Sequence, residues 1–73
     1  MLNQTKIRFA VSNLIGASEV EYEQSGDLET FSFTHIHQSY TIVHYIKTDT
    51  WKINNVLFAS IKSVIKCIER LDN

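Results

Sequence analysis

The apolar side chains of this chain change their spacing twice, and that change restricts the folds open to it. Near both ends they recur every three to four residues, the period of a helix face, whereas from about residue 20 to residue 46 they recur every second residue, the period of a strand. Proline is absent, and the two glycines, Gly16 and Gly26, fall where turns are needed. The 73 residues therefore predict a single domain, residues 1–73, with a helix at each end and strands between them.

The first apolar stretch, residues 5–15, fits one face of a helix. Its apolar side chains follow the i, i+3, i+4, i+7, i+8 spacing: Ile7, Ala10, Val11, Leu14 and Ile15. Asn3 or Thr5 is a suitable N-cap, and Gly16 suits the left-handed residue that ends many helices. The competing interpretation is a strand, because apolar and basic residues also alternate here. We favour the helix, which leaves Phe9 as an exposed aromatic residue.

A hairpin is predicted next. Val20 and Tyr22 alternate with three glutamates that would form the wet side of a strand: Glu19, Glu21 and Glu23. The following Ser25-Gly26-Asp27 favours a tight turn, with Gly26 at positive φ. A two-residue turn would place Tyr22 opposite Phe31 and Val20 opposite Phe33, which agrees with the apolar pattern.

Two further strands are predicted over residues 28–37 and 40–47, joined by a turn near Gln38-Ser39 that would pair Phe33 with His44. The core face of the sheet would then carry Val20, Tyr22, Phe31, Phe33, His35, Ile42, His44 and Ile46. The opposite face would carry Glu19, Glu21, Glu23, Thr30, Ser32, Thr34, Ile36, Thr41, Val43, Tyr45 and Lys47. The two faces alternate because successive strand side chains point in opposite directions.

The last segment, residues 56–71, has the clearest helical pattern, with Asn54 or Asn55 as its cap. Residues 51–53 are either a short fourth strand or a packed lead-in to this helix. The predicted fold class is α+β, a two-layer arrangement of helix, three-stranded antiparallel sheet and helix with both helices on one face.

The amino-acid composition is typical of a folded domain, and the sequence contains no recognisable catalytic motif. Hydrophobic residues make up 44% and charged residues 21% of the chain, and the single cysteine, Cys67, excludes an internal disulfide. His35 and His44 would lie diagonally on one sheet face, within reach of one metal ion, but we favour a structural, hydrogen-bonded role for both. We expect no enzymatic activity, no cofactor and no resident metal, because no nucleophile–base pair or phosphate-binding loop is present.

The order of elements and the length resemble the layout of the double-stranded-RNA-binding domain. That family enters its last helix through a glycine- and lysine-rich phosphate-binding motif, whereas this chain has Thr50-Trp51-Lys52-Ile53-Asn54-Asn55 there. The resemblance therefore concerns topology alone. A nucleic-acid role is the alternative hypothesis, carried by a basic ridge at i, i+4, i+8 spacing on the last helix: Lys62, Lys66 and Arg70.

The sheet face without helices is the predicted functional surface. Ile36, Val43 and Tyr45 lie there among threonines, beside the acidic strand of Glu19, Glu21 and Glu23, and Phe9 adds a second exposed aromatic group. We expect a small protein-interaction module (an inhibitor, adaptor or accessory subunit) that binds a protein partner or a second copy of itself. The 40–47 strand, as a sheet edge with Lys47 as its only charge, could pair with another chain.

The chain contains no apolar run of about 18 residues, the length that a membrane-spanning helix needs. Its N-terminal apolar stretch is interrupted by Ser12 and Asn13, which argues against a signal peptide. We expect a cytoplasmic protein without membrane partners. The richness in Ile, Ser, Thr and Asn would suit a bacterial or phage-like regulator.

Overall fold

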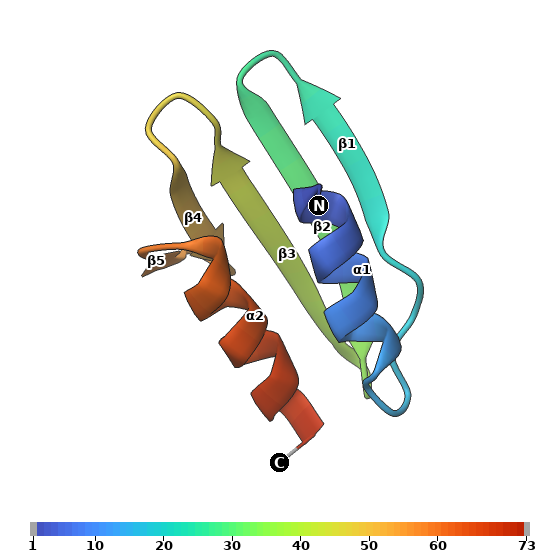
Figure 1. Cartoon of the computed structure of the whole chain (residues 1–73). Helices are drawn as coiled ribbons and strands as arrows, with labels where there is room; N and C mark the ends of the chain where they lie inside the picture. Colours follow the sequence, from blue (N-terminus) through green and yellow to red (C-terminus); the bar gives the residue numbers. More distant parts are fainter. Residues whose placement is uncertain (1, 73) are drawn as a thin grey trace.

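The computed structural model describes residues 2–72, which form two helices, five strands and a short 3₁₀ turn (Figure 1). The elements are α1 (Asn3–Ser12), β1 (Glu21–Ser25), β2 (Leu28–His35), β3 (Gln38–Tyr45), β4 (Thr50–Ile53), β5 (Val56–Phe58), α2 (Ile61–Glu69) and η1 (Arg70–Asp72). The strands form one antiparallel sheet in the order β1-β2-β3-β4-β5. The predicted α+β class is confirmed, but the sheet has five strands and not three.

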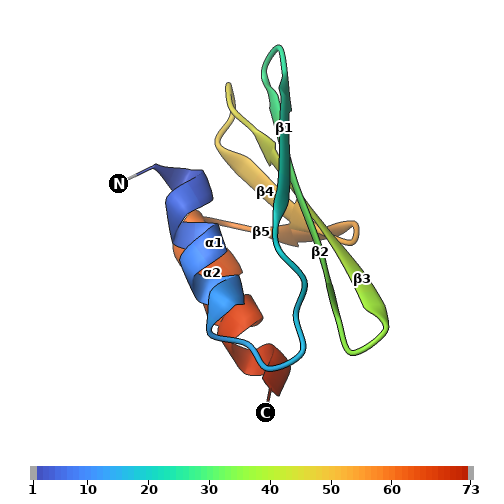
Figure 2. The ribbon, with the colours of Figure 1, turned by 90° about the vertical axis from the view of Figure 1, so that its right-hand side faces the viewer.

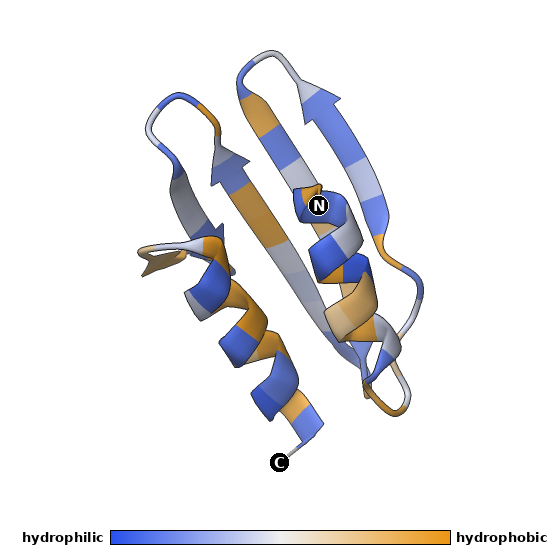
Figure 3. Cartoon of the chain, in the orientation of Figure 1, coloured by the Kyte–Doolittle hydropathy of each residue, from blue (hydrophilic) through white to orange (hydrophobic). Residues whose placement is uncertain are grey.

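Both helices lie on the same side of the sheet, where they pack against each other and close the core (Figure 2). The core contains apolar side chains from both layers: Ile7, Ala10, Val11, Val20, Phe31, Phe33, Ile42, Trp51, Ile53, Val64 and Ile68. Figure 3 shows hydrophobic residues on β2 and β3, whereas β1 is hydrophilic along most of its length. No helix of residues 2–72 covers the opposite face of the sheet.

The N-terminal segment is a helix, as the apolar spacing favours, and Phe9 is 68% exposed on it. The helix begins two residues earlier and ends three residues earlier than predicted, with Asn13 as its C-cap. Its N-cap is Leu2, so the predicted caps Asn3 and Thr5 are wrong and lie within the helix. Gly16 has a φ of 80° but lies in the connection to β1 and does not end the helix. The Arg8 guanidinium donates a hydrogen bond of 2.9 Å to the carbonyl of Val20, which ties α1 to the chain entering β1.

The first hairpin has the predicted register. Tyr22 pairs with Phe31, and Gly26 has a φ of 59° in the two-residue turn between Ser25 and Leu28. The second hairpin differs, because its turn is Ile36-His37, with φ values of 47° and 66°.

The predicted turn at Gln38-Ser39 is therefore wrong, and β3 begins at Gln38. Phe33 pairs with Tyr40 and not with His44, whose partner is Glu29. The pairing moved by an even number of residues, so each of these strand residues stays on its predicted face. Ile46 is an exception: it follows β3, is exposed and does not belong to the core.

The C-terminal third contains a second correction. Residues 51–53 belong to a fourth strand, and the predicted start of the last helix is instead a hairpin to β5. Asn54 and Asn55 form its two-residue turn, with φ values of 46° and 71°, a conformation that Asn adopts more readily than most residues. Helix α2 begins five residues later than predicted, at Ile61 instead of residue 56, where the Ser60 hydroxyl accepts a hydrogen bond from the Ser63 backbone N–H.

Candidate interaction surface

The uncovered face of the sheet carries a group of neighbouring, mostly apolar side chains. The pairing of residues across adjacent strands identifies its members. Leu28 lies opposite Tyr45 on β3, and Val43 lies opposite Lys52 on β4. Directly opposite residues on antiparallel strands share a face. Val43 and Tyr45 are two positions apart on one strand, so the four side chains adjoin. We call this group the outer patch: Leu28, Val43, Tyr45 and Lys52.

The outer patch combines partly buried aliphatic groups with an aromatic ring and a cation. Leu28 and Val43 are half-buried, whereas Tyr45 is 39% exposed. The Lys52 ammonium group lies 5.6 Å from the centre of the Tyr45 ring, a distance at which a cation–π attraction operates. This attraction favours the observed positions of the Tyr45 ring and the Lys52 side chain at the surface.

The structure brings together some of the residues that the sequence assigned to this surface and separates others. Val43 and Tyr45 share the outer face with Glu21 and Glu23, which lie on β1 beyond β2. Glu19 is exposed just before β1. Ile36 lies in the β2–β3 turn and not on a strand, so it belongs to the end of the sheet.

Phe9 is separated from the outer patch by the whole sheet. It projects from α1, on the helical side, where it borders a groove between the helices with Ala10 and Ile65. The predicted surface residues therefore fall into at least two groups, and Phe9 cannot contact a partner that binds only the outer patch.

The predicted edge strand is not an edge. β3 pairs with β2 on one side and β4 on the other, so its backbone is committed to the sheet. The edges are β1, with Glu21 and Glu23, and β5, which has no charged residue. β5 was missed because Val56 and Leu57 extend the apolar pattern of the following helix. The Asn54-Asn55 pair was the available signal for a hairpin turn.

His35 and His44 do not form a common site. His35 pairs with Gln38 beside the turn and His44 with Glu29 at the other end of the hairpin. The span from Glu29 to His35 corresponds to about 20 Å at the rise of a strand, so the predicted placement of the two rings within reach of one metal ion is wrong. Among residues 2–72, no group of three or more His, Cys, Asp or Glu residues is arranged to hold a metal ion.

His44 is buried and instead belongs to a polar network that reaches the surface at Asp49. Its Nδ1 lies 2.8 Å from Glu29 Oε1, and its Nε2 lies 2.8 Å from Asp49 Oδ1. Because carboxylates only accept, both contacts are hydrogen bonds when both ring nitrogens carry protons. The Tyr22 hydroxyl donates a bond of 2.6 Å to Glu29 Oε2. The four side chains connect β1, β2, β3 and the β3–β4 turn.

This network shifts the titration of two of its members. Burial would raise the pKa of Glu29, but the hydrogen bonds from His44 and Tyr22, with the charge of His44, outweigh burial and hold the pKa of Glu29 below its ordinary value. The hydrogen bond to Glu29, burial and the charge of that carboxylate raise the pKa of Tyr22. Folding therefore favours an ionised Glu29 beside a neutral Tyr22.

His35 has a similar role at the opposite end. Its Nε2 lies 2.7 Å from Asp72 Oδ1, while Asp72 Oδ2 accepts a bond of 2.8 Å from the backbone N–H of Ile15. The Ile15 N–H and then the His35 ring lower the pKa of Asp72, against the opposing effect of burial. The carboxylate thus links the end of η1 to β2 and to the α1–β1 connection.

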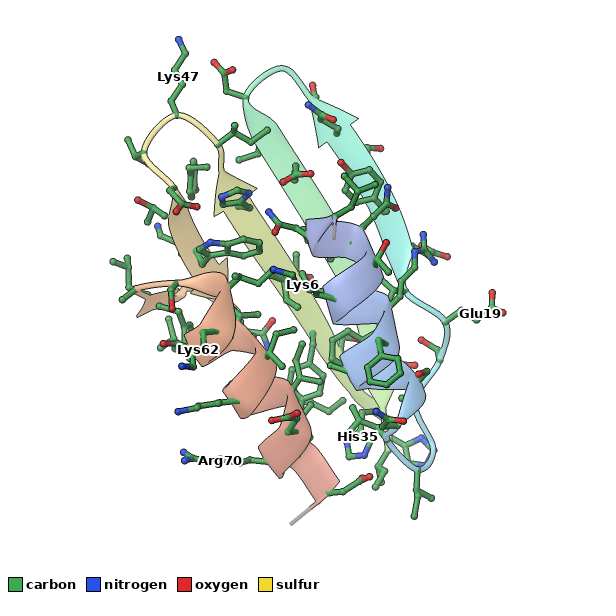
Figure 4. The ribbon with its side chains drawn as sticks, viewed as in Figure 1. Lys6, Glu19, His35, Lys47, Lys62 and Arg70 are labelled. Atoms are coloured by element: carbon green, nitrogen blue, oxygen red, sulfur yellow. The ribbon has the colours of Figure 1, made fainter. Side chains whose placement is uncertain are left out.

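The basic ridge is exposed along α2 and η1. Figure 4 shows Lys62 and Arg70 pointing to the side of α2 that faces away from α1, and Lys66 lies between them in sequence. Beside the ridge is a groove of about 440 Å³, lined by Phe58, Ser63, Lys66, Cys67, Arg70 and Leu71. Cys67 is half-buried in its wall. Sequence reasoning identified the ridge but not the groove, which depends on β5.

Within residues 2–72 no helix is both long enough and apolar enough to span a membrane. Comparisons with known proteins add no identification to this geometry. No protein-family model, no curated protein and no solved structure matches the chain.

Proposed function

We propose that the protein is a non-enzymatic interaction module that binds another protein through the outer patch. The observation that carries the proposal is the contiguous group of Leu28, Val43 and Tyr45 on a sheet face that no helix of residues 2–72 covers. A small domain gains stability by burying such side chains under helices, as it does on the other face. Their position on the uncovered face supports a role in contact with a partner.

The chemistry of the outer patch also fits an interface. Protein interfaces favour tyrosine and aliphatic groups at the centre and polar or charged groups at the rim. Here Tyr45 and Val43 lie at the centre, Lys52 borders them, and threonines and the glutamates of β1 surround them. His35 and His44 are both buried and each is bonded to a carboxylate, which supports a structural role for the two rings.

The experiment compares association of the unmodified chain with Val43→Glu and Tyr45→Glu. Sedimentation velocity measures self-association, and affinity capture from cells of the source organism identifies proteins that are retained selectively. Thr34→Glu is the matched control, because it places the same charge on the same face near the Ile36-His37 turn. We expect the two patch variants to lose association while circular dichroism remains unchanged. Association that survives both patch variants would show that the outer patch is not the binding surface.

A second candidate function is binding of duplex RNA or DNA by Lys62, Lys66 and Arg70, favoured by their exposure along one flank of α2. Charge reversal of Lys62 and Lys66 discriminates between the two candidates, because it leaves the outer patch intact. A salt-sensitive gel shift that these reversals remove would support the nucleic-acid role. No shift at low salt would exclude it.

A further inference from the structure

β5 leaves one backbone edge of the sheet open. In residues 2–72 it pairs with β4 alone, and its middle residue, Leu57, is 66% exposed. Edge strands that must not pair usually carry charges or proline, and β1 carries Glu21 and Glu23. β5 consists of Val56, Leu57 and Phe58 and has no such protection. Of the two edges of the sheet, β5 is therefore the one that presents fewer obstacles to pairing with another strand.

The hairpin register determines which backbone groups are available on β5. In a hairpin with a two-residue turn, the residues flanking the turn, here Ile53 and Val56, exchange hydrogen bonds. The next pair, Lys52 and Leu57, is therefore a pair without hydrogen bonds. The N–H and C=O of Leu57 consequently point away from β4, toward the open edge.

The charge beside this edge indicates what kind of strand fits it. Phe58 lines the groove of about 440 Å³ together with Cys67 and Leu71, and Lys66 and Arg70 border the same groove. Lys62 points to this side of α2 as well (Figure 4). The groove is apolar at its base and positively charged along its border.

We propose that β5 accepts an extended acidic segment of another protein as a sixth, antiparallel strand. The residue opposite Leu57 would exchange two backbone hydrogen bonds with it. Its two neighbours would lie opposite Val56 and Phe58 and share their face, which is the helical side. Acidic residues at those two positions would therefore face Lys62, Lys66 and Arg70. The segment has the pattern acidic–any–acidic.

Other occupants fit the observations less well. Two copies joined symmetrically at Leu57 would keep their helices on the same side and bring two basic ridges together, which is repulsive. A nucleic-acid duplex would satisfy the charges but would leave the N–H and C=O of Leu57 and the apolar base of the groove without a partner. Lys52 of the outer patch lies opposite Leu57, but the proposed contacts are the backbone edge of β5 and the groove on the helical side, so the inference does not depend on the proposed function.

The test measures fluorescence anisotropy of a labelled, capped peptide, Ser-Thr-Glu-Val-Glu-Thr-Ser, added to the full chain. We expect saturable binding that weakens at least tenfold when both glutamates are replaced by glutamine. Lys62→Glu combined with Lys66→Glu should weaken binding about tenfold, as expected for the loss of two exposed ion pairs. Lys47→Glu reverses a charge in the β3–β4 turn, away from α2 and β5, and should leave binding unchanged.

Leu57→Pro tests the backbone pairing directly. Proline removes the outward N–H and is tolerated on an edge strand at a position that donates no ladder hydrogen bond. We expect Leu57→Pro to abolish peptide binding and Leu57→Thr, which keeps the N–H, to retain it. Should Leu57→Pro unfold the chain, the paired lysine reversals decide the matter. Equal binding of the glutamine peptide, displacement of the peptide by duplex RNA alone, or a symmetric dimer that Leu57→Pro abolishes would each overturn the proposal.

Discussion

The imidazole ring of His44 lies flat against the indole ring of Trp51, with ring centres 3.9 Å apart and planes inclined by 12°. Both side chains are buried, and Phe31 packs on the indole at 6.2 Å. The edges of the imidazole meet Glu29 and Asp49. A polar group within an aromatic stack is tolerated here because its nitrogens are hydrogen bonded. His44 therefore acts as a structural link between adjacent strands.

Glu29→Gln should lower the free energy of unfolding at pH 7 by about 1–2 kcal/mol, because it removes a charged acceptor from His44 and Tyr22. Urea unfolding followed by circular dichroism measures the change. Glu23→Gln on the neighbouring strand is the matched control; its side chain is exposed, and we expect a change within about 0.5 kcal/mol. Equal losses for the two variants would contradict a stabilising role for the network.

Acid should destabilise the fold through Asp72 and Glu29, whose pKa values lie below those of the unfolded chain. A lowered folded pKa contributes stability that is present above the unfolded pKa, about 4, and lost as the pH falls through the folded value. Urea unfolding between pH 6 and pH 2 should therefore show falling stability below about pH 4. Asp72→Asn should flatten this decline. A variant that declines as steeply as the unmodified chain would assign the acid sensitivity to other groups.

Tyr22 should produce the opposite dependence in base. Its folded pKa is raised, so its contribution is present below the unfolded pKa, about 10, and lost as the pH rises through the folded value. Tyr22→Phe should be less stable at pH 8 by about 1 kcal/mol, because the bond to Glu29 is lost. That difference should shrink as the pH is raised to 11. A constant difference would mean that the hydroxyl acts only through packing.

The face of the sheet on which each side chain lies could be predicted from the sequence. Successive strand side chains alternate between the two faces, so a pairing that is wrong by an even number of residues leaves each side chain on its correct face. Phe31, Phe33, Ile42 and His44 are buried although the second turn was placed two residues too late. The turn itself could not be predicted from local preferences, since Ile36 is β-branched and disfavours positive φ. Pairing along the whole length of β2 and β3 outweighs that local cost.

The C-terminal third was harder to predict for a different reason. Val56 and Leu57 continue the helical spacing of the residues after them, so periodicity alone cannot separate a short strand from a first helical turn. The Asn54-Asn55 turn and the Ser60 cap both oppose a helix from residue 56, and together they would have indicated β5. Both the open edge and the groove beside α2 follow from that short strand.

Ile36→Gly should stabilise the protein. Ile36 has a φ of 47° and is 65% exposed, so it bears the steric cost of a left-handed backbone, about 1–3 kcal/mol, with little burial in return. Glycine keeps the N–H that Ile36 donates to the Gly16 carbonyl and removes the strain, at a smaller cost in unfolded-state entropy. We expect the free energy of unfolding, measured with urea, to rise by about 1 kcal/mol.

The control is Ile15→Gly, which changes another exposed isoleucine but one without positive φ. Its free energy of unfolding should instead fall by about 0.5–1 kcal/mol. If Ile36→Gly unfolds at lower urea than the unmodified chain, contacts of the Ile36 side chain outweigh the strain of its backbone.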